Sequence, residues 1–293
     1  MSVTDHLATL LRAPLPAERP GRPADALLLE RRAGIAGLSG PAEPVEQVIG
    51  GISCVVATVP QPRATWLHFH GGGYRHGAAR DWAAFADRLA QATGSRVVLP
   101  DYRLAPEHPC PAALNDALAV AAALAADAPG PLLLSGDSAG GGLALAAASL
   151  MKRPLPFVGI ALISPWLDLR LSAASFTRCA ATDPIFSRES AAVSAEAYLQ
   201  GLDCADPLAS PLLGDLSGLP PVHLQVSASE VVVDDSTSLA GRLAAANVEA
   251  ELFVVPDVIH DWPVVRPDEP QSKRALIRLA RFLDGLHGNE AST

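Results

Sequence analysis

Short runs rich in β-branched and aliphatic residues alternate with segments of helical periodicity along most of the chain. The runs lie at 52–59, 65–70, 96–100, 131–135, 157–164, 222–227 and 250–255, and a further candidate run at 45–50 precedes the first. The segments with apolar residues at helical spacing are 81–93, 111–126, 138–151, 235–246 and 271–286. Such alternation predicts an α/β fold with a mostly parallel sheet and helices on both faces.

This alternation stops between residues 165 and 220. The segment holds one helical patch at 188–200 and then a loop, DCADPLASPLLGDLSGLPP, that is rich in Pro, Gly and Asp. It is longer than a simple crossover between two strands. Insertions of this length usually have a function of their own, so we expect a lid or cap here.

Composition limits the class of partner. The chain has 293 residues and a net charge of −9, without a basic run. That balance argues against nucleic acid or an anionic membrane surface as the main partner. No apolar run reaches the length that crosses a membrane. We therefore expect a soluble protein that acts on a small molecule.

The cysteines and the first twenty residues indicate the cytoplasm. The four cysteines are far apart and form no C-x-x-C pair, as in a protein with free thiols rather than a disulfide framework or a zinc site. The N-terminal stretch carries charges and prolines and lacks a long apolar core, so we predict no signal peptide.

An abrupt junction occurs within PLLLSGDSAGGGLALAAASL (131–150), where a predicted strand meets a predicted helix at GDSAG. The pattern G-x-S-x-G between a strand and a helix is typical of the nucleophile elbow of α/β-hydrolases. Small glycines allow a turn sharp enough to project the Oγ of Ser138 above the sheet. A glycine-rich turn with an incidental serine is the alternative, and the flanking strand and helix favour the nucleophile.

A serine needs a histidine to take its proton and a carboxylate to orient that histidine. In α/β-hydrolases the chain order is serine, acid, histidine. Three histidines follow Ser138: His223 within a strand, His287 in the polar C-terminal segment, and His260 in a loop directly after the last strand. The loop position predicts that His260 is the base.

The acid should follow the strand before that histidine, where the sequence reads SASEVVVDDS. Glu230 comes first, on the loop. Asp234 and Asp235 come where a helix is starting, and acids there are favoured by the helix dipole. We therefore predict that Glu230 is the acid and that neutralising Asp235 has almost no effect.

Backbone donors for an oxyanion are predicted in LHFHGGGYRHG, where a strand ends in His70 and three glycines follow. Glycines let a backbone turn its N–H groups into a site. A flexible glycine loop is the alternative. His68 and His70 lie two apart on a strand, as metal ligands can, but no further cluster completes a ligand set, so we expect no metal.

These motifs together resemble the hormone-sensitive-lipase-like esterases, also called bacterial family IV, of the α/β-hydrolase superfamily. The matching pieces are HGGGY (70–74), DYRLAPEHPCPAALNDA (101–117), GDSAGG (136–141), SEVVVDDS (229–236) and IHDWP (259–263). The resemblance covers most of the chain from about residue 45. It implies an eight-stranded α/β-hydrolase domain at 45–293, and a cap built from 1–44 and an insertion at about 165–205.

The resemblance also assigns roles to residues. It implies Ser138 as nucleophile, His260 as base and Glu230 as acid, and it places the oxyanion donors at the backbone N–H groups of Gly72, Gly73 and Ala139. Residues that would support the oxyanion loop are His70, Asp101, Tyr102, Arg103 and Glu107. Candidate substrate contacts are Tyr74, Arg75, His76, Asp137 and Trp166.

Arg75 and His76 stand where many relatives carry apolar residues. They either make the mouth of the pocket polar or face outward, and the sequence leaves both alternatives open.

The function implied is that of a serine carboxylesterase that hydrolyses short- to medium-chain esters or lactones through an acyl-enzyme, without a cofactor. Alternatives on the same scaffold are a tailoring lactonase, an acyltransferase or a lyase of secondary metabolism. A non-catalytic ligand-binding relative would lack the histidine, and His260 is present. Relatives often pair through the edge strand that corresponds to AELFVV (250–255), so we also expect a homodimer.

Overall fold

The computed structural model describes residues 10–13, 15–35, 45–128, 130–151 and 153–290. An eight-stranded sheet forms the centre of this part of the chain. Every run predicted to be a strand is one, and the candidate run at 45–50 supplies an edge strand. The strands are β1 Val45–Ile49, β2 Ile52–Ala57, β3 Thr65–Phe69, β4 Arg96–Pro100, β5 Leu132–Asp137, β6 Gly159–Ile163, β7 Val222–Ser227 and β8 Ala250–Val255.

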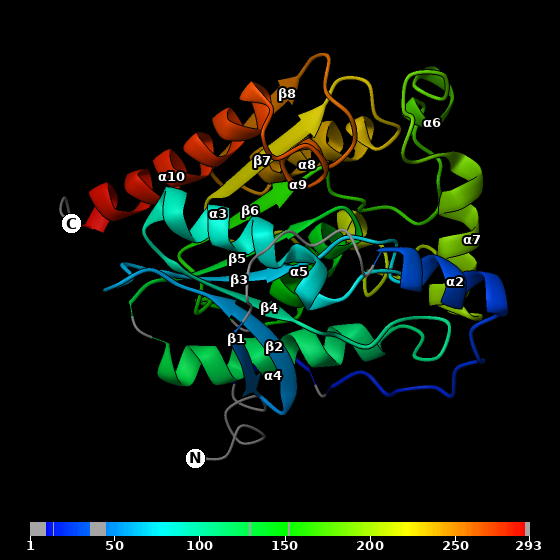
Figure 1. The fold of residues 1–293 in the computed structure, drawn as a ribbon, viewed down its shortest axis with the longest axis horizontal. Coiled ribbons are helices and arrows are strands. Elements are labelled where there is room, and N and C mark those ends of the chain that lie inside the picture. The colour runs from blue at the N-terminus through cyan, green and yellow to red at the C-terminus, as the bar shows by residue number, and fades with distance from the viewer. Residues whose placement is uncertain (1–9, 14, 36–44, 129, 152, 291–293) are drawn as a thin grey trace.

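The strands follow the order β1-β2-β4-β3-β5-β6-β7-β8 across the sheet (Figure 1). β2 pairs antiparallel with both β1 and β4, and the remaining neighbours are parallel. This is the mostly parallel sheet that the sequence predicts. Parallel strands end at the same edge of a sheet, so the loops after β3, β5, β7 and β8 come together there.

Each face of the sheet is covered by its own helices, because successive side chains of a strand point to opposite faces. Leu67 and Leu134 belong to the core under α4, α5 and α8, whereas their neighbours Trp66 and Leu133 belong to the core under α3 and α10. Figure 1 shows α3 and α10 side by side on one face. These helices are α3 Ala83–Thr93, α4 Ala112–Asp127, α5 Ala139–Leu150, α8 Val233–Ala245 and α10 Pro270–Glu290.

The long segment between β6 and β7 leaves the sheet and, with α2, lies at one end of the strands (Figure 1). Arg19 and Arg22, just before α2, reach α7: Arg19 Nη2 donates to Leu199 O at 2.7 Å, and Arg22 pairs with Glu196 at 3.0 Å. The predicted cap segment 1–44 lies outside the described residues at 1–9, 14 and 36–44. The remaining helices of the described residues are α2 Ala26–Ile35, α6 Ser175–Arg178, α7 Arg188–Leu199, α9 Trp262–Val265 and the 3₁₀ helices η1 Ala79–Trp82 and η2 Pro211–Leu213.

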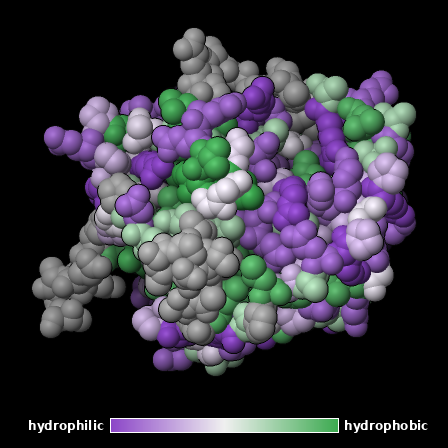
Figure 2. Space-filling view, turned by 90° about the horizontal axis from the view of Figure 1, so that it is seen from below, coloured by the Kyte–Doolittle hydropathy of each residue, from purple (hydrophilic) through white to green (hydrophobic). Residues whose placement is uncertain are grey.

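The surface is mainly polar in the view of Figure 2, where separate hydrophobic patches interrupt a largely hydrophilic face. Among the helices described, none combines the length and apolar character needed to cross a bilayer.

Candidate active site

The turn between β5 and α5 holds Ser138 with a positive φ of 50° and a ψ of −121°, a conformation that side chains rarely adopt. The two flanking glycines are required sterically. A Cβ on Gly136 would lie 2.3 Å from Gly140 O, and a Cβ on Gly140 would lie 2.0 Å from Phe69 O. Helix α5 starts at Ala139, within the predicted helical segment 138–151. This geometry is that of a nucleophile elbow.

His260 lies beside Ser138, although 122 residues separate them in the chain. The Nε2 atom of His260 is 2.9 Å from the Oγ of Ser138. On the other side of the ring, Nδ1 contacts Oε2 of Glu230. The second oxygen of Glu230 accepts the backbone N–H of Ser227 at 2.7 Å, which fixes the carboxylate at the end of β7. The three side chains thus form a hydrogen-bonded chain from the ends of β5, β7 and β8.

The loop after β3 carries the three predicted glycines. Gly72 and Gly73 have φ of +110° and +61°. At both positions a Cβ would also meet neighbouring atoms: 2.3 Å from His76 O at Gly72, and 2.8 Å from Ser194 Oγ at Gly73. Only glycine can adopt the positive φ without strain and also lacks the Cβ for which there is no room. The loop therefore depends on these glycines to approach Ser138 as closely as it does.

Asp137 connects this loop to the elbow. Its Oδ2 accepts the N–H of Gly71 at 2.9 Å, and its Oδ1 lies 3.0 Å from Nε2 of His68. His68 is tied in turn to Ser135 Oγ at 3.0 Å. Asp137 has no exposed surface. We therefore assign Asp137 to support of the loop instead of to substrate contact.

Tyr74 and Trp166, also predicted as substrate contacts, are buried in an aromatic cluster. Tyr74 stacks on Tyr198 of α7 with ring centroids 3.9 Å apart, and Trp166 packs edge-on against Phe186 at 5.3 Å. Phe186 also stacks on the ring of His260 at 5.5 Å. The cluster therefore ties the segment between β6 and β7 to the site, and no pattern in the sequence indicates the part played by Phe186.

Arg75 is buried, at 8% exposure, so the outward-facing alternative is wrong for this residue. Its Nε donates to Ser194 Oγ of α7 at 3.1 Å, and its carbonyl oxygen accepts from Arg32 of α2 at 2.7 Å. Burial lowers the pKa of Arg75. His76 packs against the glycine loop, with Nδ1 at 3.2 Å from Gly72 O, and burial lowers its pKa to about 4.

Asp234 and Asp235 both lie in the first turn of α8, as predicted, and both make contacts that the sequence does not indicate. Asp234 accepts from the N–H of Ser175 at 2.8 Å and pairs with Arg178 at 2.5 Å. The Oδ2 of Asp235, which is 1% exposed, accepts the N–H groups of both Leu167 and Asp168, at 2.7 and 3.1 Å. Among the described residues, the hydrogen bonds of the His260 ring go to Ser138 and Glu230 and to neither of these two carboxylates.

A further carboxylate does reach that ring: Asp261, directly after His260, has its Oδ2 3.2 Å from His260 Nε2. The sequence reasoning missed it, although its place beside the histidine in IHDWP was visible. Burial acts to lower the pKa of His260, but the charges of Asp261 and Glu230 outweigh burial and raise it to about 10.

Comparison with known proteins agrees with the fold and the motifs. A family model for the alpha/beta hydrolase fold matches residues 66–264. An acetyl-hydrolase of Streptomyces hygroscopicus is 37% identical over 228 residues, which are 76% of each chain. An esterase of Acinetobacter venetianus is 34% identical over 233 residues, 77% of each chain.

Solved structures are similar over nearly the whole chain. The esterase EstE5, soaked with ethyl alcohol, matches with a TM-score of 0.84 at 32% identity, over 97% of this chain and 96% of its own. An esterase from the bacterial hormone-sensitive lipase family matches with a TM-score of 0.82 at 34% identity, over 96% and 95%. The fold and the family model together define an α/β-hydrolase. Within that class the chain belongs to the hormone-sensitive-lipase-like, bacterial family IV esterases, and it is a carboxylic ester hydrolase.

Proposed function

We propose that Ser138, His260 and Glu230 are the catalytic triad of a serine carboxylesterase that works through an acyl-enzyme. The observation that carries the proposal is the contact of 2.9 Å between Ser138 Oγ and His260 Nε2, with Glu230 on the opposite ring nitrogen. This is the arrangement in which an imidazole takes a proton from a serine while a carboxylate fixes its tautomer.

The proposed reaction has two halves. The Oγ–H bond of Ser138 breaks as Nε2 of His260 takes the proton and Oγ attacks the ester carbonyl. The oxyanion then accepts the N–H groups of Gly72, Gly73 and Ala139, and His260 returns the proton to the departing alkoxide oxygen. In the second half, His260 takes a proton from water, the hydroxide attacks the acyl-enzyme, and the carboxylic acid leaves as Oγ regains its proton.

The N-terminal segment and the insertion at about 165–205 form the proposed cap. Two contacts support this: Phe186 lies against His260, and Ser194 of α7 bonds Arg75 next to the glycine loop. A cap held this close to the base leaves room for a limited acyl group. We therefore propose short- to medium-chain esters or lactones as substrates, and the name acetyl-hydrolase of one relative agrees with a small acyl group.

The free thiols of Cys54, Cys110, Cys179 and Cys204 support the further proposal that the enzyme acts in the reducing cytoplasm.

A series of p-nitrophenyl esters of increasing chain length, together with simple lactones, tests the substrate class. We expect kcat/KM to peak at short or medium chains and then fall. Rates that climb steadily to long triglycerides, with activation at an oil surface, would refute the limited pocket.

Ser138→Ala tests the nucleophile in the same assay, with Ser238→Ala on the exposed face of α8 as the matched control. We expect a loss of roughly 10⁶-fold for Ser138→Ala and no loss for the control. Activity within about tenfold of the wild type in Ser138→Ala would remove Ser138 from the mechanism.

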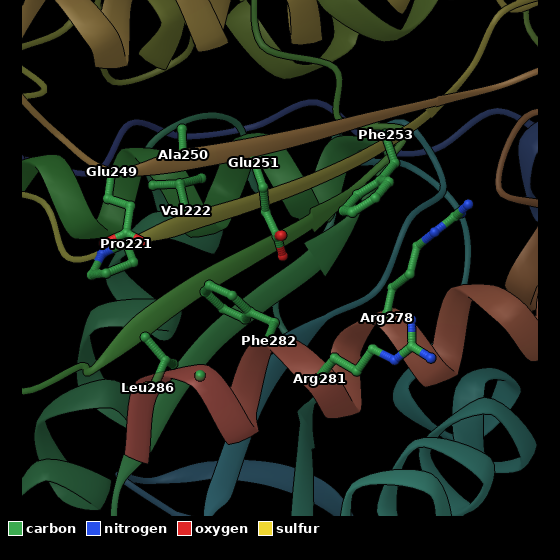
Figure 3. Close-up of a pocket in the computed structure, with 11 residues that line it drawn as sticks. Pro221, Val222, Glu249, Ala250, Glu251, Phe253, Arg278, Arg281, Phe282 and Leu286 are labelled. Atoms are coloured by element: carbon green, nitrogen blue, oxygen red, sulfur yellow. The ribbon is translucent and has the colours of Figure 1, made fainter. Parts of the chain in front are cut away.

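We also propose that the protein is a homodimer paired through β8. This edge strand exposes Val254 at 45%, and an exposed apolar edge is a template for pairing. A cavity of about 590 Å³ opens beside the strand (Figure 3), between β8 and α10. Its apolar lining includes Phe253, Phe282 and Leu286, which a second copy would cover.

Light scattering at micromolar concentration tests the dimer. We expect a dimeric mass for the wild type and a monomeric mass for Val254→Lys. Val48→Lys, on the opposite edge strand β1 where Val48 is 75% exposed, is the matched control and should stay dimeric. A monomeric wild type, or a dimer that survives Val254→Lys, would count against pairing through β8.

A further inference from the structure

A second carboxylate lies at the reacting nitrogen of His260. Asp261 adopts a left-handed conformation, with φ 52° and ψ 34°, at the residue before α9. Its N–H donates to Ser164 Oγ at 3.3 Å, and its carbonyl oxygen accepts from Val264 at 2.9 Å. With the backbone held this way, the side chain reaches the histidine ring, and Oδ2 is 3.2 Å from Nε2.

Nε2 therefore has two oxygen neighbours, Ser138 Oγ at 2.9 Å and Asp261 Oδ2 at 3.2 Å. The other ring nitrogen is engaged by Glu230. In the neutral ring, with its proton on Nδ1, Nε2 accepts the Oγ–H of Ser138. In the protonated ring, Nε2 carries a hydrogen that the carboxylate of Asp261 can accept. Only the first state can take the proton of Ser138.

The surroundings strengthen the interaction between the carboxylate of Asp261 and the ring of His260. Asp261 is 7% exposed, and its Oδ1 is buried without a hydrogen-bond partner in the part of the chain that the structure describes. Three more carboxylates face the pair: Asp137 at the end of β5, Asp183 between α6 and α7, and Glu230 after β7. Burial, followed by these charges, raises the pKa of Asp261 well above its usual range, while His260 opposes that shift.

We propose that Asp261 is a second carboxylate partner of His260, which competes with Ser138 for the proton on Nε2, so that the base-competent ring forms only at a higher pH. The proposal rests on the proposed function, because it needs His260 as the base. Asp261 acts through His260 and does not react with substrate. During attack the Oγ–H bond breaks and the Nε2–H bond forms, and Asp261 then stabilises the imidazolium until its proton passes to the leaving oxygen.

The proposal predicts two opposite effects of removing this carboxylate. The charge of Asp261 keeps His260 protonated up to a higher pH, which slows the enzyme below that pH, and it stabilises the imidazolium of the transition state, which speeds the enzyme above it. Asp261→Asn should therefore be faster than the wild type on the acidic limb of the wild-type profile and slower on the alkaline plateau. A merely structural defect would lower the rate at every pH.

The test is the pH profile of kcat/KM for p-nitrophenyl acetate over the range in which circular dichroism shows folded protein. We expect the acidic limb of Asp261→Asn to move down by about 1 to 3 pH units. Asp261→Gly, which tolerates the left-handed conformation, should move the limb in the same direction. Asp257→Asn is the matched control, because Asp257 is exposed, lies in the same loop and also has a positive φ of 58°. Its acidic limb should stay in place.

An unchanged acidic limb in folded Asp261→Asn and Asp261→Gly would overturn the proposal, and so would a uniform loss at every pH. If Ser138→Ala also abolishes activity, only the role of Asp261 has failed. If Ser138→Ala leaves the activity intact, the proposed function itself has failed.

Discussion

Replacement of Glu230 by Gln probes the geometry of the proposed triad directly. In the wild type, one carboxylate oxygen of Glu230 contacts Nδ1 of His260 and the other accepts the N–H of Ser227 at 2.7 Å. A glutamine has one oxygen and one NH₂ group, so it can satisfy only one of these two donors. If its oxygen stays on Ser227, its NH₂ faces Nδ1 and forces the ring proton onto Nε2. The ring then cannot take the proton of Ser138.

If the amide turns the other way, its NH₂ opposes the N–H of Ser227 inside a site where Glu230 is 1% exposed. Both orientations are therefore costly. We expect turnover of p-nitrophenyl acetate to fall roughly 10³- to 10⁴-fold, by analogy with the neutralised acid of serine proteases. This corresponds to about 4 to 5.5 kcal/mol in the activation barrier.

Asp234→Asn is the control for this experiment, because Asp234 lies four residues further on and binds Ser175 and Arg178 instead of the histidine. The ion pair with Arg178 is half-exposed, so its loss should cost no more than about 1 kcal/mol of stability. Turnover should change little. Should Asp234→Asn reduce the turnover of folded protein more than Glu230→Gln does, the acid has been assigned to the wrong residue.

Two further predictions concern stability. Burial raises the pKa of Asp235 to about 7, so its contribution to stability is complete below the unfolded pKa of about 4 and is lost as the pH rises through 7. Urea unfolding should show this loss of stability in the wild type and not in Asp235→Asn, whose amide oxygen can still accept the N–H groups of Leu167 and Asp168. Equal pH dependence of the stability of the two proteins would contradict this prediction. Gly140→Ala places a Cβ 2.0 Å from Phe69 O, so we expect loss of soluble, folded protein. Gly241→Ala is the control and should fold normally, because a Cβ there meets nothing within 4 Å. A folded Gly140→Ala enzyme of wild-type activity would refute the steric argument.

The sequence predicted the strands and the order of the proposed triad because both depend on local patterns. Strand and helix periodicities are set by neighbouring residues, and Ser138 and His260 lie in loops that directly follow predicted strands. Glu230 was distinguished from Asp235 by its position relative to the end of a strand. The topology of a parallel sheet then brings Ser138, Glu230 and His260 together, although they are far apart in the chain.

The remaining features depend on contacts that no local pattern encodes. The stacking of Phe186 on His260 joins an insertion to a loop 74 residues later, and Asp235 binds the backbone of a segment 68 residues before it. Arg75 was expected at the mouth of the pocket or on the outside, and it is buried because α2 and α7 cover it. Asp261 was visible beside His260, but its orientation depends on a left-handed turn that the sequence does not specify.

Hydrolysis by the proposed triad requires that Ser138 forms a covalent acyl-enzyme. Intact-mass spectrometry of the protein quenched during turnover of p-nitrophenyl acetate, followed by peptide mapping, detects this intermediate. We predict a single acetyl adduct on the peptide that contains Ser138, which accumulates when deacylation is slowed and is absent from Ser138→Ala. An adduct on another residue, or hydrolysis by the wild type with no adduct on Ser138 even when deacylation is slowed, would show that Ser138 is not the nucleophile.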